Sequence, residues 1–471
     1  MIKMFNHQIF MIGYGSVAQC LLPVLIQKFA FPHQITIMDS LPYQNKLQPF
    51  INQGVTFVQK KVTPENYAEI LDQFLSPNDL LIDLSSMVDS LSLIKWCDQQ
   101  HVMYINAAIE EWEIADLTQL DESVTLYNRH RQVEEYFAGN QNKHPSILVE
   151  HGANPGIVSH LVKKGLIELG TELLRKGLGT LRLEEFLITE NFPELARELE
   201  IKVIHISERD TQVSNRPKMP NEFVNTWSVM GLYEESLHPA EMGWGTHETI
   251  LPEDTFFNQD NPNCVWMKRS GKNVWVKSWV PHQAIIGMAI THGEAISISK
   301  HLSIHHGKHC VYCPTVHYAY CPTDNTIASL HEMEMNSLKL QPSFRIMTDD
   351  IIAGQDVLGV LLMGNPHMSW WTGSLLDIHQ SRNLIANQSA TTVQVAGGIF
   401  SALMWMKNNP NGGLLYPDDL PWHEILQEAE VYWGGFYSTG TDWTPHHLIT
   451  SPFEINSKDI SWQFHDFMLK P

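Results

Sequence analysis

A glycine motif near the start of the chain constrains the fold more than any other feature. Gly13, Gly15 and Ala18 form the pattern GxGxxA, directly after the apolar run QIFMIGY and at the start of a helical pattern. A strand, a glycine turn and a helix in this order are typical of a dinucleotide-binding unit, in which the turn and the helix N-terminus receive a pyrophosphate. The motif therefore predicts a Rossmann-type α/β domain at the start of the chain.

Short apolar runs and helical patterns alternate over the first 150 residues. QITIMD, VTFVQ, LLIDLSS, VMYINAA and SILVEHG have the length and residue types of strands, and PENYAEILDQFL and DSLSLIKWCDQQ between them fit helices. This alternation predicts a doubly wound parallel sheet with helices on both faces. We assign residues 1–150 to this NAD-binding domain.

The pattern changes after residue 150, where aromatic residues, prolines and glycines become dense. LEEFLITE, NVWVKSWVP and SFRIMTD are typical of short strands, which predicts a second α+β domain at residues 151–380. SRNLIANQSATTVQVAGGIFSALMWMKN indicates a long apolar helix within a helical segment, residues 381–471. We expect this segment to pack back on the first domain.

Composition excludes several classes of function. No run of 18 or more apolar residues occurs, which argues against a membrane span. Six cysteines in 471 residues favour reduced thiols in a cytoplasmic protein. The formal net charge of −21 argues against binding to nucleic acid or anionic membranes, because both are negatively charged and bind to basic protein surfaces. It fits either a cationic ligand or simply a solvated acidic surface.

Polar residues that follow the predicted strands are candidates for cofactor contacts. Asp39 ends the second strand, where a carboxylate binds a ribose 2′-hydroxyl. No Arg or Lys stands beside Asp39 in the sequence, so NAD is favoured over NADP. Ser16 and Val17 open the helix whose N–H groups face the phosphates. Ser85 and Ser86 follow the fourth strand and either line the cofactor or cap a helix.

An acidic and aromatic stretch suggests a second ligand. WSVMGLYEESLHPAEMGWGTHE, residues 227–248, holds two tryptophans and four glutamates, and no Lys or Arg occurs between Lys218 and Lys268. Such a segment is either a cation site or a solvated loop with two core tryptophans. Glu110 follows the fifth strand and is expected to point into the cleft. Asn154 follows the sixth strand and either contacts a ligand or caps the next helix.

With these motifs in place, the chain resembles the bacterial homospermidine synthases within the saccharopine dehydrogenase-like superfamily, from Ile9 to about residue 450. The resemblance rests on IGYGSVA, IEEW, GANPGIVSH, HISERDTQ, NTWSVMGLYEES, PAEMGWGTHE, THGEAISIS and GQDVLGVLLMG. It implies a homodimer, with substrate binding and dimerisation in the second domain at residues 151–380, and NAD as a tightly held prosthetic group. It also implies that two putrescine molecules give homospermidine and ammonia through imine intermediates, with no net redox change.

The resemblance also implies roles for particular residues. Trp227 corresponds to a tryptophan that makes a cation–π contact with the iminium. His292 is the natural proton shuttle, because its unperturbed pKa lies near neutrality. The remaining site positions implied by the resemblance are Glu110, Asn154, Glu208, Glu235, Glu294 and Asp356.

Two other functions and one other site stay open at the level of sequence. A saccharopine-type dehydrogenase with net NAD(P)H turnover would need Arg or Lys around its cleft, which the acidic stretch does not offer. An NAD-binding regulator would need no convergent carboxylates. Histidines and cysteines between His301 and Cys321 resemble a zinc cluster, but exposed histidines with buried thiols explain them more simply, and we expect no metal.

Overall fold

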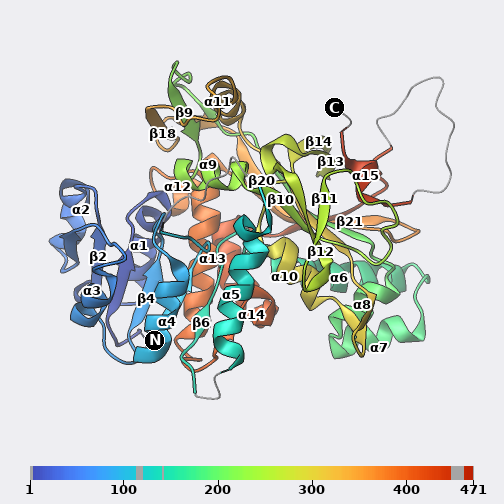
Figure 1. Cartoon of the computed structure of the whole chain (residues 1–471), viewed down its shortest axis with the longest axis horizontal. Coiled ribbons are helices and arrows are strands. Elements are labelled where there is room, and N and C mark those ends of the chain that lie inside the picture. The colour runs from blue at the N-terminus through green and yellow to red at the C-terminus, as the bar shows by residue number, and fades with distance from the viewer. Residues whose placement is uncertain (1–3, 113–119, 140–142, 447–460, 470–471) are drawn as a thin grey trace.

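The computed structural model describes residues 4–112, 120–139, 143–446 and 461–469. Within them, the first sheet has seven parallel strands in the order β22-β6-β5-β4-β1-β2-β3 (Figure 1). The six strands predicted before residue 150 are confirmed. The strands are β1 (Ile9–Ile12), β2 (Ile35–Asp39), β3 (Thr56–Gln59), β4 (Leu80–Asp83), β5 (Met103–Asn106), β6 (Ile147–Leu148) and β22 (Leu414–Leu415).

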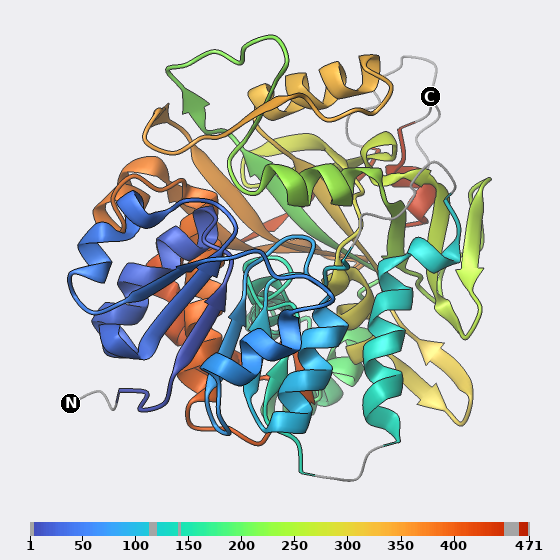
Figure 2. The same ribbon diagram turned by 60° about the vertical axis from the view of Figure 1, so that its left-hand side comes forward.

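Helices cover both faces of this sheet (Figure 2), which explains why its central strands β1, β4 and β5 are buried along their whole length. Side chains alternate between the faces, so that Ile9 and Met11 of β1 join one core cluster and Phe10 and Ile12 join another. The sheet thus has the predicted doubly wound architecture. The helices of this part of the chain are α1 (Ser16–Lys28), α2 (Gln44–Ile51), α3 (Tyr67–Phe74), α4 (Ser90–Gln100) and α5 (Leu126–Ala138).

A second, mixed sheet follows in the described residues, with the path β11-β12-β10-β17-β7-β20-β21-β23. β7 lies at its centre, parallel to β17 and antiparallel to β20. The hairpin of β13 and β14 joins it through β17. Its strands are β7 (Val203–Asp210), β10 (Pro239–Gly243), β11 (Thr255–Asn258), β12 (Asn261–Ser270), β13 (Trp275–Val280), β14 (Gln283–Met288), β17 (Thr315–Cys321), β20 (Gln355–Met363), β21 (Ser369–Asp377) and β23 (Tyr437–Thr441).

Three two-stranded sheets and further helices surround the second sheet. The paired strands are β8 (Val213–Ser214) with β19 (Ile351–Ala353), β9 (Glu222–Asn225) with β18 (Ser343–Ile346), and β15 (Ile304–His306) with β16 (His309–Tyr312). The helices are α6 (Ile157–Arg175), α7 (Leu181–Thr189), α8 (Phe192–Glu198), α9 (Val229–Leu237), α10 (Gly293–His301), α11 (Asp324–Met335), α12 (Ile378–Leu384), α13 (Ala390–Met406), α14 (Trp422–Ala429) and α15 (Phe464–Phe467).

The strand prediction for LEEFLITE is wrong, because this segment belongs to helix α7. Thr180 caps the helix by accepting a hydrogen bond from the N–H of Leu183 at 3.0 Å. Leu183 and Leu187, four residues apart, lie on one helix face against Gly170 of α6. The segment therefore forms a helix because its apolar residues, four apart, pack on one face. In so short an apolar run, this spacing cannot be told from a strand pattern.

The C-terminal segment is not the single helix that its composition predicts. α12 ends at Leu384, Asn387 adopts a positive φ of 59°, and α13 begins after Ser389, whose hydroxyl caps it. α13 packs against α1 (Figure 1), while β22 joins the first sheet and β23 joins the edge of the second. Domain boundaries at residues 150 and 380 stay a prediction.

Candidate active site

A cavity of about 770 Å³ lies at the carboxyl ends of the first sheet's strands and reaches the second sheet. It begins where the strand order reverses between β1 and β4, the place where open α/β sheets bind ligands. Most of the residues singled out in the sequence line it. They are Gly13, Gly15, Ser16, Val17, Asp39, Ser85, Ser86, Glu110, Asn154, Glu208, Trp227, Glu235 and His292.

The glycine turn has the geometry that a bound diphosphate needs. Gly13 has a φ of +90°, and a Cβ there would lie 2.5 Å from the carbonyl oxygen of Leu84, so only glycine fits. A Cβ on Gly15 would meet nothing within 4 Å, because this residue faces the cavity. No side chain caps the N-terminus of α1, which leaves the first N–H groups of the helix for a ligand.

Asp39 is held at the end of β2 by two backbone hydrogen bonds. Its carboxylate accepts from the N–H of Tyr14 at 2.7 Å and from the N–H of Leu41 at 2.8 Å. Lys60 and Lys61, which follow the neighbouring strand β3, also line the cavity. Strand pairing thus brings to this cavity two lysines that do not stand beside Asp39 in the sequence.

Ser85 and Ser86 line the cavity rather than cap a helix. The Ser85 hydroxyl donates to Asp83 Oδ1 at 2.5 Å, and Asp89 is the residue that caps α4. Burial raises the pKa of Asp83 to about 6, although hydrogen bonds from Ser85 and Tyr104 oppose the shift.

Glu208 stands at the centre of the polar wall, on β7. Its Oε2 accepts a hydrogen bond from Asn154 Nδ2 at 3.3 Å and a short one from the Tyr318 hydroxyl. Burial raises the pKa of Glu208 to about 7, against the lowering effect of Tyr318. The helix-capping alternative for Asn154 is wrong, since α6 begins after Gly156 and no side chain caps it.

His292 lies between two carboxylates. Its Nε2 is 3.2 Å from Glu235 Oε2 and its Nδ1 is 3.2 Å from Glu294 Oε1. Burial lowers the pKa of His292, but Glu294 and Glu235 together raise it further, so the net pKa is well above the usual value. The two carboxylates therefore favour the protonated form of the ring, whereas burial favours the neutral form of Glu235. The role of His292 as a proton shuttle stays a prediction.

Trp227 presents part of its indole ring to the cavity. It lies in the connection between β9 and α9, and its Nε1 donates to the Tyr320 hydroxyl at 3.1 Å. A Cβ on Gly231 would come within 2.9 Å of the indole, so the α9 backbone lies directly against the ring. The other tryptophan of the acidic stretch, Trp244, belongs to a hydrophobic core cluster.

Most of the acids in that stretch are structural, although no Lys or Arg lies near them in the sequence. Each acid has a partner from a distant part of the chain or from a neighbouring element. Among the described residues, Glu235 is the one of the four that lines the larger cavity. Glu234 pairs with Arg129, Glu235 with His292, Glu241 with the N–H groups of Leu126 and Tyr127, and Glu248 with Thr315 and the N–H of Phe464.

Glu294 and Asp356 lie behind the cavity wall. Both are buried and neither lines the cavity. Glu294 contacts His292, which lines the cavity. Asp356 accepts a hydrogen bond from Thr391 at 2.6 Å. Burial and the neighbouring Glu208 raise the pKa of Asp356 well above its usual value. These two carboxylates are therefore placed to act through other residues.

Three residues of the site escaped the sequence analysis. Tyr318 and Tyr320 on β17 point to one face of the second sheet, which the alternation in TVHYAYC signals. Arg129 comes from α5. Nothing in the sequence around it indicates a role in the site, because its partners Glu111 and Glu234 are not neighbours of Arg129 in the chain.

The histidine and cysteine cluster lies away from the cavity. His305, His306 and His309 are exposed on the β15–β16 hairpin, and Cys313 is buried. Across the ranges that the structure describes, no group of three or more His, Cys, Asp or Glu is arranged to hold a metal ion.

A Rossmann-type sheet joined to a mixed-sheet domain across a polar cavity defines the general class. Residues 9–147 match the saccharopine dehydrogenase NADP binding domain, and residues 152–434 match the saccharopine dehydrogenase C-terminal domain. The chain belongs to the saccharopine dehydrogenase-like superfamily and, within it, to the homospermidine synthase family.

Similarity to individual proteins extends over almost the whole chain. Homospermidine synthase of Blastochloris viridis is 34% identical, over 98% of this chain and 97% of that one. Its counterpart from Mesorhizobium japonicum is 32% identical, over 98% and 96%. The crystal structure of homospermidine synthase from Legionella pneumophila, in complex with NAD, has 35% identity and a TM-score of 0.88 and covers 99% of both chains.

Proposed function

We propose that this protein makes homospermidine and ammonia from two molecules of putrescine, with NAD as a prosthetic group. The observation that carries the proposal is that one cavity joins the glycine turn and Asp39 to Glu110, Glu208, Glu235 and the indole ring of Trp227. Putrescine is a dication near neutral pH, and carboxylates and aromatic faces bind ammonium groups. The relatives named above support the same activity.

The residues around the glycine turn fit NAD. The turn admits a diphosphate, and Asp39 is fixed where it can accept from a ribose hydroxyl while repelling a 2′-phosphate. When bound, NAD supplies the acceptor, and later the donor, of the electron pair that interconverts amine and imine.

The chain's own residues bind and deprotonate the amine. An ammonium group must lose a proton before its carbon–nitrogen bond can be oxidised, and Glu208, with a pKa of about 7, is suited to accept that proton. Glu235 and Glu110 line the same cavity; burial raises the pKa of each, and an ammonium group of the substrate bound between them would favour their charged forms. Trp227 faces the intermediate iminium without exchanging a proton with it.

The decisive experiment is an assay of purified protein with putrescine and NAD. We expect homospermidine and ammonia in equal amounts, with no accumulation of NADH. Stoichiometric NADH would instead indicate a saccharopine-type dehydrogenase, and no turnover with NAD bound would indicate a regulator. A reaction without putrescine is the control.

Asp39→Ala is expected to weaken NAD binding by about tenfold or more, because it removes hydrogen bonds to a charged group. The dissociation constant of NAD, measured by calorimetry on protein stripped of cofactor, checks this. Glu65→Gln, at an exposed acid on the same cavity, is the matched control and should leave the constant unchanged. Equal NAD binding by Asp39→Ala and wild type would remove Asp39 from the cofactor site.

We further propose a cytoplasmic homodimer, which the family resemblance supports. Light scattering on the purified protein would give the mass of the assembly directly. In the described part of the chain, no helix is both long enough and apolar enough to cross a membrane.

A further inference from the structure

Three buried carboxyl groups lie next to one another on the second sheet. Glu208 and Asp210 are two residues apart on β7, so both side chains lie on the same face of that strand. Asp356 on β20 pairs directly with Asp210, and its side chain is in hydrogen-bonding contact with Glu208. No more than 2% of any of the three residues is exposed. Glu208 lines the larger cavity, and the other two lie behind it.

Asp210 is bonded as a carboxylate. Its Oδ1 accepts from the N–H of Gln212 at 2.9 Å and from Nε2 of the same residue at 3.1 Å, and its Oδ2 accepts from the Thr226 hydroxyl at 2.7 Å. The Gln212 amide is fixed in this orientation, because its Oε1 accepts from the N–H of Ala390. Burial raises the pKa of Asp210, but these hydrogen bonds oppose the shift. Three donors thus stabilise the charged form of Asp210.

Asp356 is bonded as a neutral acid. Thr391 donates to its Oδ2 at 2.6 Å, whereas its buried Oδ1 has no hydrogen-bond partner in the part of the chain that the structure describes. A proton on Asp356 would remove this defect, because the acid could then donate to Glu208. Burial, Glu208 and Asp210 raise the pKa of Asp356 well above its usual value. The negative charge beside Glu208 is therefore that of Asp210.

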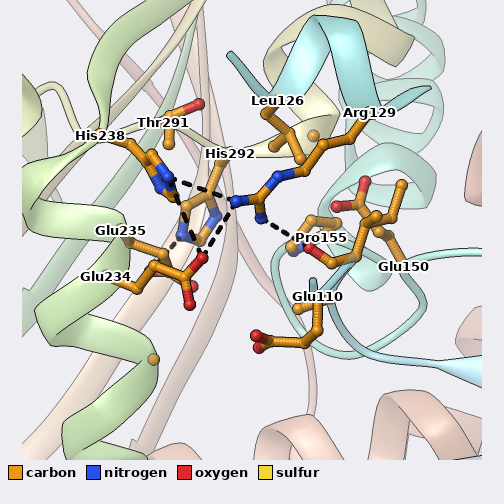
Figure 3. Close-up of a pocket in the computed structure, with 14 residues that line it drawn as sticks. Glu110, Leu126, Arg129, Glu150, Pro155, Glu234, Glu235, His238, Thr291 and His292 are labelled. Carbon is orange, nitrogen blue, oxygen red and sulfur yellow. Dashed lines mark hydrogen bonds and ion pairs between the residues drawn. The ribbon is translucent and has the colours of Figure 1, made fainter. Parts of the chain in front are cut away.

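The basic residues nearby have other partners. The Arg209 side chain lies on the opposite face of β7, where its Nη2 is 3.4 Å from Asp324. His292 lowers the pKa of Glu208, but its Nε2 is bonded to Glu235. It lines both the larger cavity and an adjoining cavity of about 40 Å³ (Figure 3). None of the three clustered carboxyl groups forms an ion pair with a basic residue among those described.

The remaining titratable neighbours are uncharged near neutral pH. Tyr318 and Tyr320 on β17 lie next to Glu208, and burial raises the pKa of both phenols well above the usual value. Burial also raises the pKa of the Cys321 thiol, which lies near Asp210. These groups therefore do not compensate the charge of Asp210.

We propose that Asp210 is a positioning residue whose fixed negative charge strengthens the hold of Glu208 on a proton. This inference rests on the proposed function, in which Glu208 deprotonates the amine. Two like charges in a buried site repel each other, and the repulsion ends when Glu208 takes up a proton. Without this charge, Glu208 would be a weaker base and would return its proton too readily. Asp210 itself does not reach the cavity, so it acts through Glu208.

Asp210→Asn tests this with little disturbance of the fold. The amide oxygen still accepts from Gln212, and the amide nitrogen can donate to the Thr226 hydroxyl. The inflection in kcat/KM for putrescine is expected to move about one pH unit below its position in wild type. The ratio of kcat/KM at pH 6 to that at pH 8 should then rise about fivefold. Lower activity at every pH with an unmoved inflection would make Asp210 merely structural and overturn the proposal.

An infrared titration measures the same shift without turnover. The carboxyl stretch of Glu208 is isolated by subtracting the spectrum of the same protein carrying Glu208→Gln, in heavy water and over a range of pH. Its midpoint should fall in Asp210→Asn by as much as the kinetic inflection does. This readout does not depend on the substrate, so putrescine turnover by wild type tests the proposed function separately.

Two amide variants at other buried acids complete the test. Asp350→Asn, at an acid bonded to Ser214 and Arg345 instead, is the matched control and should leave the Glu208 midpoint unchanged. Asp356→Asn should also leave it nearly unchanged, because that acid is already neutral. A midpoint that falls in Asp356→Asn would place the charge on Asp356 and overturn the proposal. This second outcome decides the question even if Asp210→Asn does not fold.

Discussion

Replacing Glu208 by Gln is expected to lower kcat by about a hundredfold or more while NAD remains bound. General acid–base groups typically contribute factors of about 10² to 10⁴, and Glu208 is the cavity carboxylate whose pKa of about 7 matches a proton acceptor. The amide keeps the size of the side chain but cannot accept a proton. Steady-state kinetics with putrescine, together with the NAD content of the purified variant, measures both quantities.

The pH profile separates loss of a base from a structural effect. A base with a raised pKa is deprotonated only above that value, so kcat/KM of wild type should increase as pH rises through about 7. This inflection should vanish in Glu208→Gln. In Tyr318→Phe it should move to higher pH, because the lost hydrogen bond stabilised the carboxylate.

Buried Glu241 offers a control for the same chemical change. It contacts the start of α5 and does not line the larger cavity. Glu241→Gln should lower the thermal midpoint while keeping the inflection near pH 7. An inflection that persists in Glu208→Gln would assign the proton transfer to another group.

Trp227→Ala is expected to lose about thirtyfold in kcat, with fold and NAD content intact. A desolvated cation–π contact is worth about 2 kcal/mol, which corresponds to that factor if the contact is made mainly in the transition state. Trp227→Phe should keep part of the activity, because a weaker aromatic face remains. Rates of homospermidine formation in the two variants, with circular dichroism to check the fold, test this.

Tyr320→Phe distinguishes the indole face from its hydrogen bond. This change removes the acceptor of the Trp227 Nε1–H but leaves the ring in place, so only a small loss is expected. The released iminium, trapped as its aldehyde, should increase in Trp227→Ala because the cation is held less firmly. If Ala and Phe at position 227 both match wild type, the ring serves packing alone.

Local sequence was sufficient for six strands of the first sheet but not for β22, which comes from the segment predicted to be helical. Each of the six is a short apolar run between helical patterns, and Gly13 marks the turn after β1 because no other residue fits its backbone and its contact with Leu84. The same reasoning misassigned LEEFLITE, whose helical spacing becomes visible only through the contact of Leu183 and Leu187 with Gly170. A short apolar run is compatible with strand and helix alike, and packing decides between them.

The sequence by itself determined that a dinucleotide-type turn and an acidic, aromatic segment are present. Only the tertiary structure decided which acids face the cavity. Arg129, the start of α5 and Phe464 neutralise or bind Glu234, Glu241 and Glu248, whereas Glu235 reaches the cavity beside His292. A carboxylate's charge and pKa depend on partners within a few ångströms, and folding chooses those partners from distant parts of the chain.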